Sequence, residues 1–117
     1  MIMEKINISV VNVVGDIFCT EATDGQKVFD LINKALKEDK AVNLSFVNVK
    51  MLTTAFLNTA VGQLYKDYSE ERIKESLTVE QLTPSGSVSL KRVVDTAKLY
   101  YKNPGAMEQS IKDILGE

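Results

Sequence analysis

The sequence predicts an α/β fold in which a small mixed sheet of four or five strands is backed by helices, with a short helix added at the C-terminus. Several short segments alternate apolar and polar residues, as half-buried strands do. The segments between them repeat apolar residues every three to four positions, as amphipathic helices do. The chain has 117 residues, of which 44% are apolar and 26% charged, and this composition is typical of one globular domain. Because strands that alternate with helices are joined by crossovers, the crossover strands should run parallel.

Two strands are expected near the N-terminus. Residues 2–14 are rich in β-branched residues, and Ile6, Ile8 and Val10 alternate with polar neighbours. Gly15 and Asp16 then interrupt the pattern, and residues 17–20 have the composition of a second, short strand. We expect these two strands to pair as a hairpin across that turn.

The first helix is expected to begin at Thr23. Thr23 and Gln26 have the spacing of a capping box, in which each side chain bonds to a backbone N–H of the other residue. The helix should end near residues 39–40, and the alternation over residues 41–47 predicts that a strand follows directly. The expected inner face of the helix consists of Val28, Leu31, Ile32, Ala35 and Leu36.

The strongest helical pattern runs from Thr53 to Tyr68, where apolar residues form one continuous stripe. Ser69 then predicts the cap of a short helix that ends near Lys74, because two glutamates follow it. Residues 77–82 alternate again and predict the last strand.

The turn over residues 83–87 contains Pro84 and Gly86, which end that strand, and the last helix of the domain should follow it. We divide the chain into a domain over residues 1–103 and a helical tail over residues 104–117. The tail should dock on this domain, on a second copy, which would make an oligomer, or on a partner. Its apolar residues, at helical spacing, are Met107, Ile111, Ile114 and Leu115.

Several function classes are excluded by composition. The chain has no His and one Cys, Cys19, so it cannot form a Ser-His-Asp or Cys-His site, a disulfide, or a Cys/His zinc centre. We therefore expect no cofactor, no metal and no catalytic activity. The net charge of −2 disfavours nucleic-acid binding. Because no apolar run is long enough to span a bilayer and no signal-peptide core follows the N-terminus, we expect a cytoplasmic protein without membrane contact.

Hydroxyl-rich turns follow two of the predicted strands and form the candidate site. Thr53 and Thr54 come after the strand over residues 41–47, and Ser85, Gly86 and Ser87 come after the strand over residues 77–82. If those strands are parallel, both turns lie at the carboxyl edge of the sheet, where helix N-termini present unpaired N–H groups. The simpler interpretation is that these hydroxyls only cap the helices.

Asn58 is a further candidate, since it is a polar residue at the margin of the second helix's apolar stripe. It either contacts a partner or is merely exposed.

The segment from Val42 to Tyr68 resembles a STAS-like family of unknown function, which is related to the sulfate-transporter and anti-sigma-factor-antagonist domains. The resemblance is carried by Phe56-Leu57-Asn58 and by Gly62-Gln63-Leu64-Tyr65. It implies a sheet backed by helices and a non-catalytic protein-binding module of bacterial-type signalling. Its partner would be a histidine-kinase-like ATPase or another signalling protein.

The same resemblance implies a switch. In the better-known antagonists, a partner kinase phosphorylates a serine in an Asp-Ser-Ser-Gly turn at the start of the second helix, which ends binding. Thr54 stands at the position of that serine, whereas Leu52 and Ala55 replace the acidic residue and the glycine. Our leading hypothesis is therefore a regulatory protein-binding module, with phosphorylation of Thr54 as its switch.

Two alternatives remain open. The first is a small-ligand or nucleotide sensor that holds an anion at the two helix N-termini. The second is an enzyme in which Asp16, Glu21 and Asp24 would have to converge, although nothing in their spacing indicates that they do.

Overall fold

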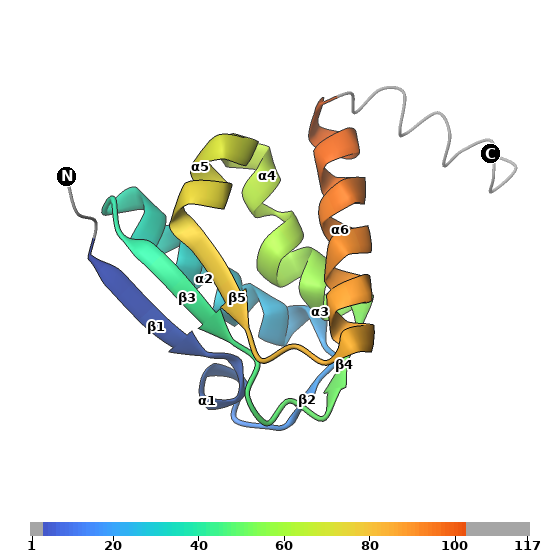
Figure 1. The fold of residues 1–117 in the computed structure, drawn as a ribbon. Helices are drawn as coiled ribbons and strands as arrows, with labels where there is room; N and C mark the ends of the chain where they lie inside the picture. The colour runs from blue at the N-terminus through green and yellow to red at the C-terminus, as the bar shows by residue number, and fades with distance from the viewer. Residues whose placement is uncertain (1–3, 103–117) are drawn as a thin grey trace, which may run out of the picture.

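The computed structural model describes residues 4–102. The predicted tail helix lies outside the described residues, as do the first residues of the predicted N-terminal strand. Within the described range, Figure 1 shows a twisted sheet at the front, with helices behind it and one long helix beside it. The confirmed part of the fold prediction is thus an α/β arrangement with a small sheet backed by helices.

The main sheet has three parallel strands, β1 (Lys5–Ser9), β3 (Ala41–Ser45) and β5 (Leu77–Glu80), in the order β1-β3-β5. Val42 and Leu44 point toward the helices and are fully buried. The opposite face carries a polar ladder, in which the Asn43 amide donates to Asn7 Oδ1 at 3.2 Å and the Thr78 hydroxyl donates to Asn43 Oδ1 at 3.0 Å. The alternation seen in the sequence therefore marks a sheet that is covered on one face only.

The N-terminal hairpin prediction was wrong. Residues 10–14 form a helix, α1 (Val10–Val14), because the Ser9 hydroxyl accepts a hydrogen bond from Asn12 N–H and Gly15 ends the turn with a φ of 79°. The chain is thereby turned away from β1. The next strand, β2 (Phe18–Cys19), instead pairs in parallel with β4 (Met51–Leu52) as a second sheet. In the described residues there are thus sheets of three and two parallel strands, rather than one mixed sheet of four or five.

Helix α2 (Ala22–Lys37) begins one residue before the predicted cap. Its N-cap is Glu21, which makes no side-chain capping bond, so the expected capping box at Thr23 does not form. Gln26 instead donates to Asp30 at 2.9 Å and accepts from Gln63 at 3.0 Å. The predicted inner face is buried except for Leu31, which is 43% exposed.

The predicted long second helix is confirmed in outline, with a break in its regularity. It consists of α3 (Thr54–Leu57), a π-helical turn η1 (Asn58–Gly62) and α4 (Leu64–Asp67). The apolar stripe faces the core, and its buried members are Phe56, Leu57, Ala60, Val61 and Leu64. Helix α5 (Glu70–Ser76) follows and is capped by the hydroxyl of Ser69, as predicted.

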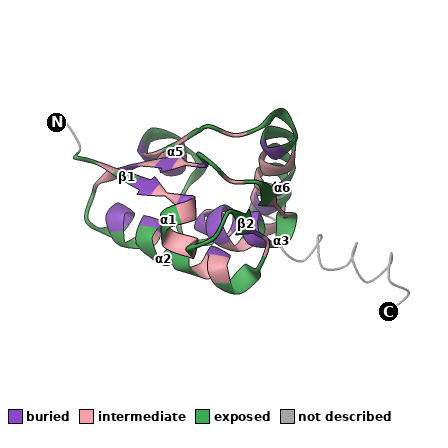
Figure 2. Cartoon of the chain, turned by 90° about the horizontal axis from the view of Figure 1, so that it is seen from below, coloured by how far each residue is buried: buried purple, intermediate pink, exposed green. Residues whose placement is uncertain are grey.

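Helix α6 (Pro84–Lys102) begins earlier than expected, so residues 84–87 form its first turn instead of a loop. Pro84 suits this position because a first-turn N–H would have no partner within the helix. The Thr83 hydroxyl accepts from the N–H of Gly86 at 3.0 Å and thereby caps the helix. Figure 2 shows the buried residues gathered on the inward faces of the helices and strands. Among residues 4–102, no helix combines the length and apolar composition that crossing a membrane requires.

Candidate functional site

Helices α2, α3 and α6 begin at one end of the molecule, the lower end in Figure 1. We call this end the carboxyl rim and define it as residues 17–22, 46–54 and 81–87, which follow or contain the carboxyl ends of β2, β3, β4 and β5. In parallel α/β sheets, this end gathers helix N-termini with unpaired backbone N–H groups, and ligands and partners commonly bind there.

The two threonines at the start of α3 have different environments. The Thr53 hydroxyl accepts from Phe56 N–H at 3.3 Å and donates to the carbonyl oxygen of Thr20 at 2.8 Å. Thr53 therefore caps α3 and also links the end of β4 to the end of β2 by a hydrogen bond. Thr54, the first residue of α3, is exposed. Of the two hydroxyls, that of Thr54 is the accessible one.

The second predicted turn lies at the start of α6. Ser85 and Ser87 are exposed, and the Ser85 hydroxyl lies 3.3 Å from the Thr83 hydroxyl. Gly86 is buried, and a side chain there would meet Thr83 Oγ1 at 3.1 Å and Leu82 at 3.2 Å. Gly86 is therefore closely packed against the side chains of Thr83 and Leu82, while the two serines are exposed.

The structure brings the two turns together. A Cβ atom added to Gly86 would lie 3.6 Å from the side chain of Leu52, the residue before Thr53. A cavity of about 200 Å³ lies between the two segments. Its polar lining includes Lys50, Gln81, Thr83, Ser85 and Ser89, and its floor includes Phe46 and Leu52.

Asn58 does not lie with these residues. It is the first residue of η1 and lines a different cavity, together with residues from the second half of α6, Thr96, Ala97, Tyr100 and Tyr101. The predicted site residues thus fall into two places, with Asn58 separate from the hydroxyl-rich turns.

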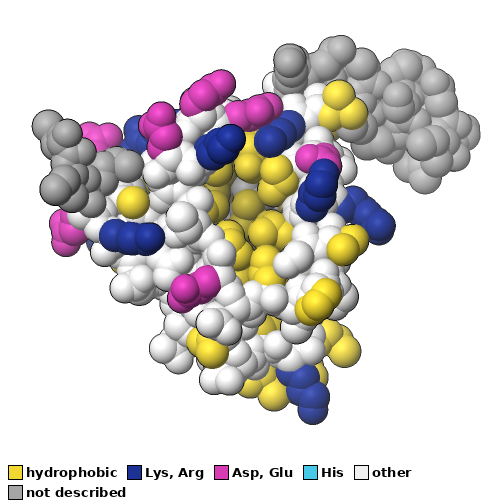
Figure 3. All heavy atoms as spheres, in the orientation of Figure 1, with side chains coloured by type: hydrophobic (Ala, Val, Ile, Leu, Met, Phe, Trp, Pro, Cys, Tyr) yellow, Lys and Arg dark blue, Asp and Glu magenta, His cyan; other side chains and the backbone are white. Residues whose placement is uncertain are grey.

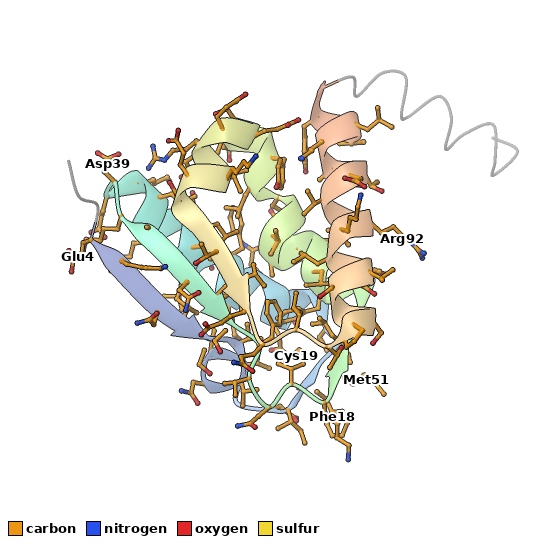
Figure 4. All side chains as sticks on the ribbon, in the orientation of Figure 1. Glu4, Phe18, Cys19, Asp39, Met51 and Arg92 are labelled. Carbon is orange, nitrogen blue, oxygen red and sulfur yellow. The ribbon has the colours of Figure 1, made fainter. Side chains whose placement is uncertain are left out.

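An exposed apolar pair on the carboxyl rim was missed by the sequence analysis. Phe18 and Met51 are register partners in the β2–β4 ladder, and they are 44% and 54% exposed. Figure 4 shows both side chains at the lower end of the molecule. Val47 and Ile17 are further exposed apolar residues of the same rim. The only signal for the pair in the sequence was the presence of large apolar residues next to predicted turns.

Cys19 follows Phe18 in β2 but is itself fully buried. Burial raises the pKa of its thiol above the ordinary 9.0, and the nearby carboxylates of Asp24 and Asp16 raise this pKa further. The thiolate is the nucleophilic form, so this environment suppresses its reactivity.

Two of the acidic residues that we considered as an enzyme site interact with residues close to them in the sequence. Asp16 accepts from Phe18 N–H at 3.0 Å, and Asp24 lies 3.3 Å from the ammonium of Lys27. Across residues 4–102, no three His, Cys, Asp or Glu side chains converge in a way that could hold a metal ion.

Comparison with known families gives a match over the central part of the chain. Residues 24–87 match the family described as a STAS-like domain of unknown function (DUF4325). The matched segment begins in α2, contains the candidate turn at residues 53–54, and ends in the first turn of α6. No curated protein and no solved structure is detectably similar to the chain.

Proposed function

The protein belongs to this STAS-like family, whose model covers more than half of its 117 residues, and we propose that it is a non-catalytic regulatory module that binds a protein partner through the carboxyl rim. The observation that carries the proposal is the exposed pair Phe18 and Met51, which lies beside the start of α3.

The pair has the properties of an interface anchor. Large apolar side chains that a partner removes from water contribute roughly 25 cal/mol per Å² of buried apolar area. The backbone of Phe18 is held by the β2–β4 ladder and by the bond from its N–H to Asp16, so little backbone freedom would be lost on docking. The exposed residues Lys50 and Thr54, which lie next to Met51 and three residues after it in the chain, supply polar groups beside the pair, and interfaces generally place such groups around an apolar centre.

The proposed switch is phosphorylation of Thr54. A phosphate adds about −1.5 to −2 charge, and the N-terminus of a helix tolerates this charge because its N–H groups are unpaired. The fold should therefore survive the modification. A partner that buries Met51, three residues away, would instead have to desolvate the phosphate, which is costly. By family resemblance, the proposed partner is a histidine-kinase-like ATPase or another signalling protein.

The test is quantitative affinity capture from the native cell, with the captured proteins identified by mass spectrometry. Met51→Asp and Thr54→Glu should each lose the specific partner. Two matched controls change other exposed residues away from the rim: Leu31→Asp on α2 and Thr96→Glu on α6. Circular dichroism should show that all four variants are folded. If the rim variants capture the same proteins as the wild type, the proposal is wrong.

The alternative proposal is a sensor that holds a small anion in the cavity between the two turns. Lys50 and the hydroxyl of Ser85 line this cavity and favour such a ligand. We rank it second, because the cavity of about 200 Å³ is smaller than the roughly 300–1,000 Å³ typical of small-molecule sites. Calorimetry with nucleotides and inorganic phosphate distinguishes the two proposals, since only the sensor should release or absorb heat.

A further inference from the structure

A second apolar surface lies between β5 and α6. Figure 3 shows it as a hollow at the centre of the view, between β5 and α6, with charged side chains at its upper end. The groove holds about 400 Å³. Its apolar lining includes Val61 and Tyr65 from the second helix, Leu77 and Val79 from β5, and Leu90 and Val94 from α6.

The walls of this groove are incompletely covered. Leu77, Val79, Leu90 and Val94 are apolar but only partly buried, although they pack against the main core. Strand β5 is at the edge of the three-stranded sheet, and no other described strand pairs with its outer side. The charged residues around the groove, Glu70, Glu71, Lys74 and Lys98, come from α5 and α6. The groove is therefore apolar along its length and charged at one end.

We propose that this groove is the docking site of the chain's own C-terminal segment, residues 103–117, which packs there as an amphipathic helix antiparallel to α6. The segment starts directly after Lys102, the last described residue of α6, and α6 forms one wall of the groove. Asn103-Pro104-Gly105 provides the reversal that an antiparallel helix pair requires, because proline and glycine end a helix and permit a tight turn.

The C-terminal segment has apolar residues on one helical face and polar residues on the other, as a helix that packs in an apolar groove would have. Met107, Ile111 and Ile114 recur at spacings of four and three residues, and Leu115 extends the same face. Polar residues occupy the opposite face and would remain in water; they are Gln109, Lys112 and Asp113. A helix this short is marginal in isolation, so it needs a surface to pack against.

The lengths also agree. A helix over residues 106–115 is about 15 Å long at 1.5 Å per residue, and the wall from Leu90 to Lys98 spans about 12 Å. With the reversal centred on Pro104, Ile114 lies opposite Val94. Ile111 then faces the part of the groove near Lys98, and Leu115 reaches toward Leu90.

Cross-linking tests the location directly in the full chain. Val94→Cys combined with Ile114→Cys should react with a short bismaleimide to give a monomeric cross-linked product. The matched control combines Leu99→Cys with Ile114→Cys, since Leu99 is nearer to the tail in sequence but is 59% exposed and does not line the groove. Cys19 should not interfere, because it is buried.

A docked tail should make the first pair react about tenfold faster than the control pair, because docking raises the local concentration at one position only. A freely tethered tail would favour the control pair or show no difference, and either result would overturn the proposal. A cross-linked product of twice the mass would also overturn it, since it would place the tail on a second copy.

Stability gives an independent readout. Ile111→Asp combined with Leu115→Asp should lower the Tm by about 5–10 °C, because both residues would lose their burial. The control, Gln109→Asp combined with Lys112→Gln, lowers the net charge by the same two units on the opposite face and should leave the Tm unchanged. Equal Tm values for the two double variants would contradict docking.

Discussion

Gly25→Ala should destabilise the protein although Gly25 lies inside a helix. The residue is buried in α2, where this helix packs against the second helix. A Cβ atom added there would lie 2.5 Å from the backbone carbonyl oxygen of Phe56. Contacts below 3.0 Å are essentially never found for real Cβ atoms, so at least 0.5 Å of movement is needed. The obstacle is backbone, which cannot rotate aside, and two further contacts lie at 3.1 Å and 3.3 Å.

Two opposing effects determine how far Gly25→Ala lowers the free energy of unfolding. Replacing glycine by alanine in a helix interior ordinarily stabilises by about 1 kcal/mol. Overpacking in a tight interface costs about 1–3 kcal/mol, and separation of two helices belongs at the upper end of that range. We therefore expect the free energy of unfolding to fall by about 2 kcal/mol. Urea denaturation followed by circular dichroism should show a midpoint lower by roughly 1–2 M.

Gly62→Ala is the matched control, because it is also a buried helical glycine. Its added Cβ would meet Asn58 Oδ1 at 2.9 Å, which is the end of a side chain that can rotate away. The next contact, to Val93, is an ordinary 3.5 Å. We expect a change within about 1 kcal/mol. A Gly25→Ala protein as stable as the wild type, or more stable, would refute the inference that close backbone packing selects glycine at this position.

Three further predictions concern single side chains. Thr53→Val should lower the free energy of unfolding by about 1–2 kcal/mol in thermal denaturation, while Thr53→Ser, which keeps both bonds, should cost less than half of that. Arg72→Met should lower the free energy of unfolding by about 2 kcal/mol in the same assay, because Arg72 donates to Leu36 O at 2.6 Å and to the buried Ser76 hydroxyl. The control Lys91→Met removes an exposed ion pair and should lower it by under about 0.5 kcal/mol. Equal losses in the two variants would contradict the importance of the Arg72 bonds. The raised pKa of Cys19 means that its thiol keeps its proton to higher pH in the folded protein than in the unfolded chain. The contribution of the buried thiol to stability is therefore complete below about pH 9 and is lost as the pH rises through the folded-state pKa. Urea titrations across this range should show a shallower alkaline loss for Cys19→Ala, and an unchanged slope would count against burial as the cause.

Elements with a strong and local pattern could be predicted from the sequence. The stripe from Phe56 to Leu64 identified the second helix because its apolar residues pack against the core at helical spacing. Ser69 was identified as a cap because the capping bond involves only the next three residues. The π-helical turn within the second helix was not predicted, since the apolar spacing is the same on both sides of it.

Pairings between distant segments could not be predicted in the same way. Residues 10–14 include four valines and favour a strand by composition, yet Ser9 and Gly15 end the strand and close a helical turn. Strand β2 has only two residues, and its partner β4 is 33 positions away, so no alternation could reveal the ladder. Residues 53–54 and 85–87 lie near each other, although residues 53–54 follow β4, a strand that the sequence did not predict, rather than β3 directly.

The β2–β4 ladder makes folding separable from the partner binding that we propose at the carboxyl rim. The bonds that hold it come from backbone groups and from the Thr53 hydroxyl, including Lys50 N–H to Ile17 O at 2.8 Å and Thr53 Oγ1 to Thr20 O at 2.8 Å. The exposed side chains of Phe18, Met51 and Thr54 make none of these bonds. Substitutions at these three positions should therefore change the proposed docking surface while the ladder stays intact. A variant at Thr53 should instead lose stability and binding together, because the same hydroxyl caps α3 and joins the two strands.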